Sequence, residues 1–191
     1  MAERADKVVS SESEELILVD AHDNPTGTLS KALCHNGDGI LHRAFSLFIF
    51  NDKGELLLQQ RSGEKRLWPL YWSNSCCSHP RSGETMAQAV DRRLAQELGM
   101  RSELEFIYKF RYQANYAEEG SEHELCSVYL GRSNARPSVN ANEIAEVRYL
   151  SAKALEDELG RSAQRFTPWF KLEWTRLKKE FGEQLASYTS S

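Results

Sequence analysis

Residues 73–80 read Ser-Asn-Ser-Cys-Cys-Ser-His-Pro, and residues 85–99 read TMAQAVDRRLAQELG. The longer stretch predicts an amphipathic helix, because it opens with a T-x-x-Q capping box and ends on a glycine at the C-cap position. The shorter stretch joins two thiols and an imidazole, and in an extended segment Cys77 and His79 point to the same side. This pairing suggests a chemical role. An ordinary loop with a buried cysteine is the alternative.

Strands and further helices are predicted on both sides of this segment. Residues 23–28 (DNPTGT) read as a turn, and residues 51–54 read as the loop of a β-hairpin. Thr167 followed by proline is typical of a helix start. Strands and helices in no repeating order favour an α+β fold, an α/β/α sandwich in which helices flank a mixed sheet. Strands are expected at 15–20, 44–50, 55–61, 104–112, 123–131 and 147–151, and helices at 85–99, 151–159 and 168–181.

The composition of the 191-residue chain is typical of a globular protein, with 40% hydrophobic and 27% charged residues. We expect one domain over residues 14–186, preceded by a flexible leader over residues 1–13. The net charge of −4 argues against nucleic acid or a membrane surface as a partner. No apolar run approaches the ~20 residues of a membrane span, and the N-terminus lacks the apolar core of a signal peptide. Two of the four cysteines are adjacent, so free thiols and a cytoplasmic location are expected.

Two pairs of charged residues occupy unexpected positions. Arg93 and Glu97 lie at the edge of the apolar stripe of the predicted helix, although a surface i,i+4 salt bridge would also explain them. Glu122 and Glu124 point to one face of a strand, where like charges repel unless a cation or a proton lies between them. An exposed strand end is the alternative for this second pair.

Three histidines add nitrogen donors to these carboxylates. His35 and His42 flank a glycine-rich turn, and His79 follows the two thiols. With Glu122 and Glu124 they form a mixed nitrogen and oxygen set of the kind that suits Mn²⁺, Zn²⁺ or Mg²⁺. Each histidine alone is more often a surface or core residue, and spacing along the chain does not bring the five together.

The N-S-x-C-x-H-P segment, together with PTGTLSKALCH, LHRAFSLFIF, RRLAQELG, FRYQANY, EHELC and TPWF, resembles the type I isopentenyl-diphosphate Δ-isomerases, a metal-dependent family with a Nudix-like fold. The resemblance extends from about residue 16 to residue 170. The same region resembles a degraded Nudix box, in which Ser78 stands at the opening glycine while Arg93 and Gln96 replace two glutamates. Nudix hydrolases use those glutamates to hold Mg²⁺, so their replacement argues against hydrolysis.

The resemblance implies a reversible isomerisation of isopentenyl diphosphate to dimethylallyl diphosphate, which feeds isoprenoid biosynthesis. One proton is added to the alkene and another leaves from C2, so the reaction needs an acid and a base close to the substrate. Cys77 and Glu124 would act on opposite faces, with Glu124 near C4 and Cys77 near C2. Tyr112 would hydrogen-bond the catalytic glutamate.

The resemblance also implies two metal sites and a substrate pocket. One site would hold Mn²⁺, Zn²⁺ or Mg²⁺ on His35, His42, His79, Glu122 and Glu124. Glu97 would help to hold a second ion, Mg²⁺, on the substrate diphosphate. The residues that would contact the substrate are Lys31, Arg61, Lys65 and Arg93 at the diphosphate and Trp169 at the hydrocarbon.

The expected partner is a small prenyl diphosphate, and the expected assembly is a monomer or a weak homodimer. Two alternatives stand beside the isomerase. A Nudix-type diphosphate hydrolase would need no thiol. A non-enzymatic module would use the histidines and glutamates only to bind a metal.

Overall fold

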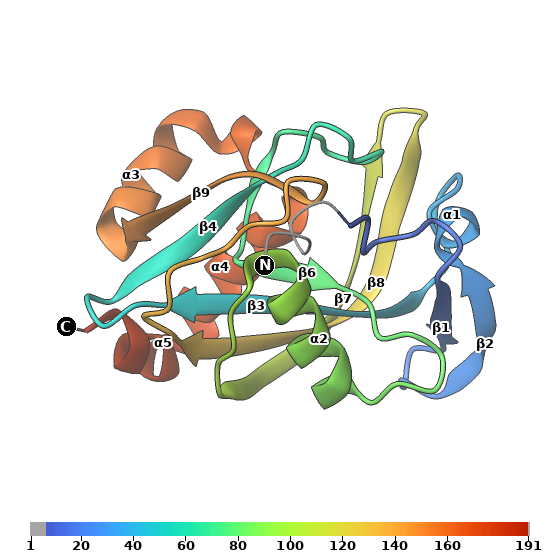
Figure 1. Cartoon of the computed structure of the whole chain (residues 1–191), viewed down its shortest axis with the longest axis horizontal. Helices are drawn as coiled ribbons and strands as arrows, with labels where there is room; N and C mark the ends of the chain where they lie inside the picture. The colour runs from blue at the N-terminus through green and yellow to red at the C-terminus, as the bar shows by residue number, and fades with distance from the viewer. Residues whose placement is uncertain (1–6, 191) are drawn as a thin grey trace.

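The computed structural model describes residues 7–190, in which helices flank one nine-stranded sheet (Figure 1). This arrangement confirms the predicted α+β fold with a mixed sheet between helices. The strands are β1 (Glu15–Val19), β2 (Pro25–Ser30), β3 (His42–Phe50), β4 (Glu55–Arg61), β5 (Trp72–Ser73), β6 (Cys76–Ser78), β7 (Leu104–Tyr116), β8 (Gly120–Arg132) and β9 (Ile144–Ser151). The helices are α1 (Lys31–Cys34), α2 (Met86–Leu98), α3 (Ala152–Ser162), α4 (Pro168–Glu180) and α5 (Gly182–Thr189), with a 3₁₀ turn at Ala163–Arg165.

The central strand of the sheet is β3. It pairs in parallel with β8 along its whole length, beginning with His42 opposite Glu124. It also pairs antiparallel with β6, where Ser46 lies opposite Cys77. β7 and β8 form a long antiparallel hairpin, β4 pairs with β9, and β1 pairs with β2. The sheet is therefore mixed, with β3 joining its two halves.

The core lies on both faces of β3, because successive residues of this apolar strand point to opposite sides. Phe48 and Phe50 pack on the face that α4 covers. Phe45, Leu47 and Ile49 pack on the face that α2 covers (Figure 1). All five side chains are fully buried. Burial of one such side chain contributes ~1.5–3 kcal/mol, so this strand anchors the helices on both sides.

The predicted hairpin of residues 44–50 and 55–61 is only partly correct. β3 and β4 are joined by a tight turn and are antiparallel, but in their register only Phe50 and Leu56 pair. Beyond that pair the two strands diverge. β4 continues beside β9 and β5, while β3 continues beside β8 and β6.

Ser75 links β3 to β4 where the strands diverge, Asn74 links β3 to β6, and both side chains are fully buried. Ser75 Oγ accepts a hydrogen bond from the Ile49 amide at 2.8 Å and donates to the Leu57 carbonyl at 2.6 Å. The Asn74 amide donates to the Cys76 carbonyl at 2.8 Å. Because buried backbone groups need partners, these side chains replace the missing ladder. They also direct the chain into β6.

Helix α2 begins and ends where the sequence predicts. The Gln88 amide donates to Thr85 Oγ1 at 3.3 Å, and Gln88 Oε1 accepts from the Thr85 amide at 2.9 Å. Gly99 follows with a left-handed φ of 63°, a conformation that glycine adopts without a steric penalty. An N-cap side chain of this kind stabilises a helix by ~1 kcal/mol.

Other boundaries differ from the prediction. Residues 25–30 form the edge strand β2 rather than a turn, with Pro25 at its first position, where a missing N–H is tolerated. α1, β5 and β6 have four residues or fewer, too few for a periodic pattern. α5 continues to Thr189, beyond the predicted domain end at residue 186. Within residues 7–190, no helix is both long and apolar enough to cross a membrane.

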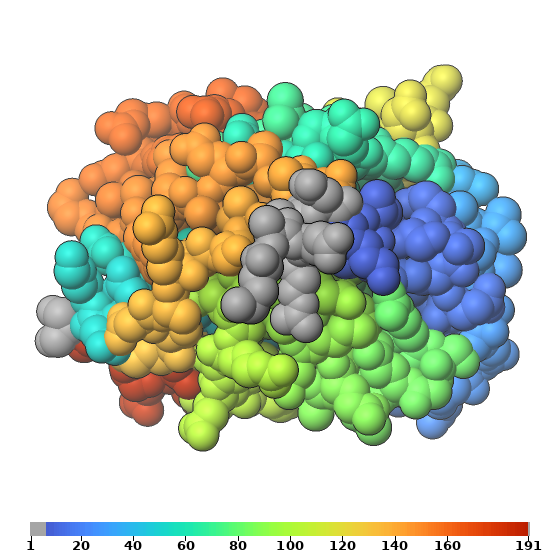
Figure 2. Space-filling model, viewed as in Figure 1, coloured from blue at the N-terminus to red at the C-terminus, as the bar shows by residue number. Residues whose placement is uncertain are grey.

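The predicted leader, residues 1–13, falls partly outside the described residues, which begin at residue 7. Residues 7–13 lie along the surface of the domain beside α2 and the segment before β9 (Figure 2). The Asn140 amide donates to the Lys7 carbonyl at 2.8 Å, and Arg93 Nη1 donates to the Val9 carbonyl at 2.6 Å. The contacts of the domain therefore begin before residue 14.

Helix α4 buries one carboxyl group, that of Glu173, in the apolar layer between the helix and the sheet. The Glu173 side chain is fully buried, and Cys126 Sγ donates to its Oε1 over 3.5 Å. Its Oε2 has no hydrogen-bond partner among residues 7–190. Burial raises the pKa of Glu173 to about 8, because the charged form is poorly solvated there. Glu173 is thus a neutral acid at pH 7.

Glu173→Gln should become more stable than the wild type as pH rises. The folded pKa of Glu173 exceeds its ordinary value of 4.5, so the stability that its protonated form provides is complete below about pH 4.5 and is lost as pH rises through about 8. Glutamine keeps the shape without the ionisation. The difference in unfolding free energy should grow by at most roughly 1.4 kcal/mol per pH unit in that window.

Urea denaturation at several pH values measures this difference, with the exposed Glu118→Gln as a control. A difference between Glu173→Gln and the wild type that stays constant with pH would contradict the assignment of Glu173 as a buried neutral acid.

Candidate functional site

Strand register brings the five predicted metal ligands together. His42 is the first residue of β3 and pairs with Glu124 of β8, and Glu122 lies two residues earlier on the same face. His79 directly follows β6, which is aligned against β3. His35 directly follows α1. Residues 35–42, His79 and residues 122–124, three regions distant from one another in sequence, therefore meet at one end of the central strands.

Gly120 lets His35 approach the β7–β8 hairpin. The Ser121 amide donates to the His35 carbonyl at 3.0 Å. Gly120 has a φ of 144°, and a Cβ atom there would lie only 2.2 Å from that carbonyl oxygen. Any side chain at residue 120 would push the His35 backbone away, so the glycine is required by close approach.

The five ligands form one buried cluster. Their donor atoms all lie within 4.8 Å of one another, and each of the five side chains is buried. His35 Nε2 is 2.8 Å from Glu122 Oε2, His79 Nε2 is 3.0 Å from Glu124 Oε1, and His42 Nε2 is 3.9 Å from the same Glu124 oxygen. This grouping of three imidazoles and two carboxylates could hold a metal ion.

Hydrogen bonds behind the imidazoles fix which nitrogen faces the cluster. His35 Nδ1 lies 2.7 Å from the Lys31 carbonyl, and His42 Nδ1 lies 2.6 Å from the Ile40 carbonyl. A carbonyl only accepts, so both Nδ1 atoms carry a proton, and Nε2 of a neutral imidazole then presents a lone pair. Burial disfavours the charged form of His35, but the Glu122 carboxylate outweighs burial and raises the pKa of His35. Within residues 7–190, these Nε2 atoms and Glu122 Oε2 are buried without a hydrogen-bond partner. Acceptors facing one another without a donor fit a cation between them.

The pKa values of the cluster are consistent with this fit. Burial lowers the pKa of His42 to about 4 and that of His79 well below its ordinary value, so both imidazoles are neutral at pH 7. Burial raises the pKa of Glu124, and the neighbouring Glu122 raises it further. The pKa of Glu122 is well below its ordinary value, because the imidazoles outweigh the effect of burial. The protonated form is therefore favoured at Glu124 and the charged form at Glu122, and a cation would favour the charged form of both.

Tyr112 hydrogen-bonds Glu124, as the resemblance implies. The two residues are opposite each other in the β7–β8 ladder, and the Tyr112 hydroxyl donates to Glu124 Oε2 at 2.7 Å. The other oxygen, Oε1, faces His79. Each carboxylate oxygen therefore has its own neighbour, and the orientation of the Glu124 side chain is fixed.

Strand alternation separates the two adjacent thiols. Cys76 points to the face under α2 and is fully buried in that half of the core. Cys77 points to the opposite face and lines a cavity of about 420 Å³. Burial raises the pKa of the Cys77 thiol to about 12, although the Arg61 guanidinium opposes this effect. Cys77, and not Cys76, is thus the thiol that a small molecule can reach.

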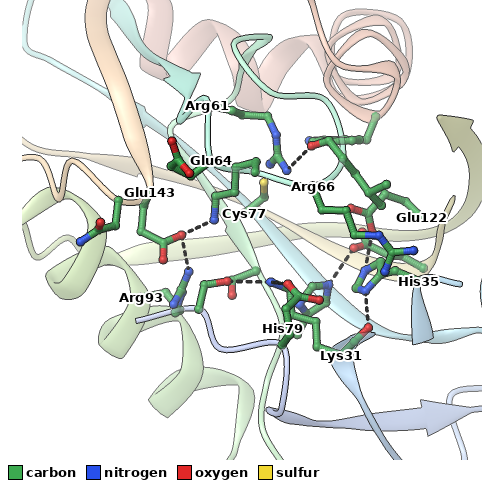
Figure 3. A pocket seen from close by; sticks show the side chains of 18 of the residues that line it. Lys31, His35, Arg61, Glu64, Arg66, Cys77, His79, Arg93, Glu122 and Glu143 are labelled. Atoms are coloured by element: carbon green, nitrogen blue, oxygen red, sulfur yellow. Dashed lines mark hydrogen bonds and ion pairs between the residues drawn. The ribbon is translucent and has the colours of Figure 1, made fainter. Parts of the chain in front are cut away.

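The same cavity collects the other predicted substrate residues (Figure 3). Arg61 is held by the carbonyls of Leu67 at 2.9 Å and Trp68 at 3.0 Å, and its guanidinium lies 5.2 Å from the centre of the Trp169 ring. The cavity also reaches four of the five cluster residues, His42 being fully buried. The predicted residues that line it are Lys31, Arg61, Lys65, Cys77, His79, Arg93, Tyr112, Glu122, Glu124 and Trp169, together with His35.

Glu97 stands apart from the five-residue cluster. Its carboxylate accepts from Arg93 Nη2, and the two side chains are 4% and 2% exposed. The alternative of a surface salt bridge is therefore wrong, and the unexpected position of the pair reflects burial. A buried ion pair of this kind requires further polar partners to offset its desolvation.

Two acidic residues that the sequence did not single out contact the cavity cations. Glu143 is 2% exposed and pairs with both Lys65 and Arg93. Glu12 accepts from Lys31 Nζ at 3.0 Å. Nothing in the local sequence distinguishes Glu143 from Glu146, because both stand near the start of a strand. The cations that pair with Glu143 come close to it only in the folded chain.

The sequence is similar to those of known proteins. A family model described as NUDIX domain matches residues 40–170. The chain is 42% identical over 175 residues to "Isopentenyl-diphosphate Delta-isomerase 1" of Photorhabdus laumondii, covering 90% of this chain and 99% of that protein. It is 36% identical over 180 residues to an isopentenyl-diphosphate Delta-isomerase of Escherichia coli, covering 93% and 98% of the two chains. A protein of the same name from Gibberella zeae is 37% identical, with 91% and 78% covered.

Solved structures share the fold at lower identity. A Deinococcus radiodurans protein superposes with a TM-score of 0.64 at 24% identity, covering 78% of this chain and 90% of that one. A MutT protein of Methanosarcina mazei gives 0.61 at 20% identity, with 74% and 95% covered. These likenesses establish the architecture of the sheet and its helices.

We predict that the wild-type chain binds about one transition-metal ion at the five-residue cluster and that His79→Ala lowers this content by more than about half. Removal of one buried ligand leaves the ion with fewer ligands and therefore weakens its binding. Elemental analysis of dialysed protein measures the content. The exposed His22→Ala is the matched control and should retain the ion. Equal metal content in wild type and His79→Ala would argue against the cluster as the site.

Proposed function

Because the chain belongs to the isopentenyl-diphosphate Delta-isomerase family, we propose that it converts isopentenyl diphosphate to dimethylallyl diphosphate and so feeds isoprenoid biosynthesis. The observation that carries the proposal is one cavity that brings the Cys77 thiol and the Glu124 carboxyl group together with five cationic side chains. Cys77 and Glu124 supply the two groups that proton addition and removal require, and the cations suit a diphosphate. The assembly is proposed to be a monomer or a weak homodimer.

The proton steps are assigned to Glu124 and Cys77 on opposite faces of the substrate. In the forward direction Glu124 gives a proton to C4, and Cys77 removes one from C2, so that the double bond moves to C2–C3. The reverse reaction exchanges the two roles. Burial raises the pKa of Cys77 to about 12, so its thiolate needs stabilisation, and the Arg61 guanidinium provides a nearby positive charge. Tyr112 holds the Glu124 carboxyl in a fixed orientation.

The hydrocarbon end of the substrate is assigned to the aromatic wall of the cavity. Protonation of the alkene gives tertiary carbocation character, which water would trap as an alcohol. Trp169 is 2% exposed and is packed edge-on by Trp68 at 5.2 Å between ring centres. Aromatic faces stabilise a nearby cation by ~0.5–2 kcal/mol and exclude water.

The diphosphate end is assigned to Lys31, Arg61, Lys65 and Arg93, which reach the cavity from α1, β4, the segment after β4 and α2. Mn²⁺, Zn²⁺ or Mg²⁺ is proposed for the His/Glu cluster and Mg²⁺ for the diphosphate, with Glu97 helping to hold the latter. A cation at the cluster would orient Glu124 and make its protonated form a stronger acid.

A diphosphate hydrolase remains the rival that shares the fold. Two features favour the isomerase over it. Arg93 and Gln96 stand where a Nudix hydrolase carries metal-binding glutamates. Hydrolysis by water also gives no role to Cys77, which lines the cavity.

The protein, incubated with isopentenyl diphosphate and Mg²⁺ in deuterated water, should yield dimethylallyl diphosphate that carries deuterium. The proton added to C4 exchanges with solvent between turnovers, and mass spectrometry or NMR detects the label. Chelation by EDTA should abolish turnover, and Mn²⁺ or Mg²⁺ should restore it. Release of inorganic phosphate without the isomer would identify a hydrolase instead.

Cys77→Ala should lower kcat by about 10³-fold, because it removes one of the two proton-transfer groups. Cys76→Ala is the matched control: it removes an adjacent thiol from the opposite face and should cost stability rather than turnover. Isomerase kinetics and thermal unfolding separate the two effects. Full turnover by Cys77→Ala would rule out the proposed mechanism.

A further inference from the structure

Glu143 joins two of the cavity cations through a single oxygen atom. Its Oε2 accepts from Lys65 Nζ and lies 3.4 Å from Arg93 Nη2 (Figure 3). The Glu143 side chain is 2% exposed, whereas that of Lys65 is 19% exposed where it lines the cavity. Both side chains line the cavity, and the carboxylate is the more deeply buried of the two.

The backbones of Glu143 and Lys65 are both hydrogen-bonded to the backbone of Ser62. The Ser62 amide donates to the Glu143 carbonyl at 2.9 Å, and the Lys65 amide donates to the Ser62 carbonyl at 3.2 Å. The Glu143 amide in turn donates to the Asn140 carbonyl at 3.0 Å. Neither partner can therefore move far from the other without breaking backbone hydrogen bonds.

Lys65 depends on a negative charge nearby. Burial lowers the pKa of its ammonium group, and Glu143 opposes that effect. The other charged groups around Lys65 are Arg61 of β4, Lys31 of α1, and Arg93 and Glu97 of α2. Three of these four are cations, so Glu143 is the carboxylate in direct contact that favours the charged form.

Arg61 and Lys31, which do not contact Glu143, are held differently. Arg61 is bound by two backbone carbonyls. Lys31 pairs with Glu12, which is 53% exposed. Lys65 combines burial, a titratable head group and a buried carboxylate partner, so its charge and position depend on one residue.

We propose that Glu143 is a positioning residue for Lys65: it keeps the ammonium group charged and aimed into the cavity, where the group binds the diphosphate. This assignment rests on the proposed function for the identity of the ligand. An ammonium group has three donors, and Glu143 takes one, so the other two stay available to anionic oxygens. Glu143 need not touch the substrate.

Amine labelling tests this assignment without turnover. The wild type and Glu143→Gln are treated at about pH 7.5 with an amine-selective acylating reagent, and peptide mass spectrometry compares Lys65 with the exposed Lys53. Loss of the carboxylate should raise the relative labelling rate of Lys65 about tenfold, because more of the amine is neutral. Glu64→Gln, an exposed charge loss beside Lys65 that also lines the cavity, should label like the wild type.

The same assay tests the link to the ligand. Inorganic diphosphate should protect Lys65 from labelling in the wild type, and protection in Glu143→Gln should need about tenfold more of it. With isopentenyl diphosphate, Glu143→Gln should raise KM far more than it lowers kcat. Glu143→Asp keeps the charge on a shorter side chain, so its Lys65 labelling rate and its KM should lie between those of the wild type and Glu143→Gln. This variant also replaces Glu143→Gln in the test if the glutamine variant does not fold.

Equal Lys65 labelling in the wild type and both Glu143 variants would overturn the inference. Failure of the proposed function has a different signature: the wild type would not isomerise isopentenyl diphosphate, while Lys65 labelling would still depend on Glu143. Wild-type isomerase activity with labelling independent of Glu143 would leave the proposed function intact and exclude the positioning role.

Discussion

The parallel pairing of β3 with β8 is the constraint on which the rest of the molecule depends. It aligns His42 with Glu124 at one end of the sheet and places apolar residues of both strands under α4 along the remainder. A shift of one residue would turn every side chain of β8 to the other face. The core would then lose its packing and the cluster its carboxylates, so stability and the site are tied to one register.

The divergence of β3 from β4 is the second condition for the site. Ser75 satisfies an amide of β3 and a carbonyl of β4 where the two strands separate. Asn74 donates to carbonyls of β3 and β6, and β6 lies against β3. Alternation along β6 then places Cys76 in the core and Cys77 in the cavity. The small polar residues beside the thiols are therefore structural, and they determine which thiol is accessible. Polar side chains inside a core cost free energy unless they are fully hydrogen-bonded, and these two meet that condition.

Local patterns in the sequence predict the elements whose causes are local. α2 follows from its capping box and apolar spacing, and the central strand follows from an apolar run that both faces of the sheet bury. The five ligands were found through their types and a resemblance, but their convergence depends on pairings between distant strands, which spacing does not reveal. For the same reason, helix spacing left both a buried pair and a surface pair possible for Arg93 and Glu97. The partners that make burial tolerable, Glu143 and Val9, lie far away along the chain. Short strands such as β5 and β6 have no periodic signal because neighbouring strands and side chains, not propensity, define them.

Strand register buries together a set of acceptors that a single cation can satisfy. Denaturant unfolding of the chelator-treated chain over a range of free Mn²⁺ or Zn²⁺ tests it most directly. The account predicts that the free energy of unfolding rises by about 1.4 kcal/mol for each tenfold increase in free ion above the dissociation constant. It further predicts that this dependence disappears in His42→Ala. An unfolding free energy that does not change with metal concentration would contradict the account, because protons alone would then suffice to hold the cluster together.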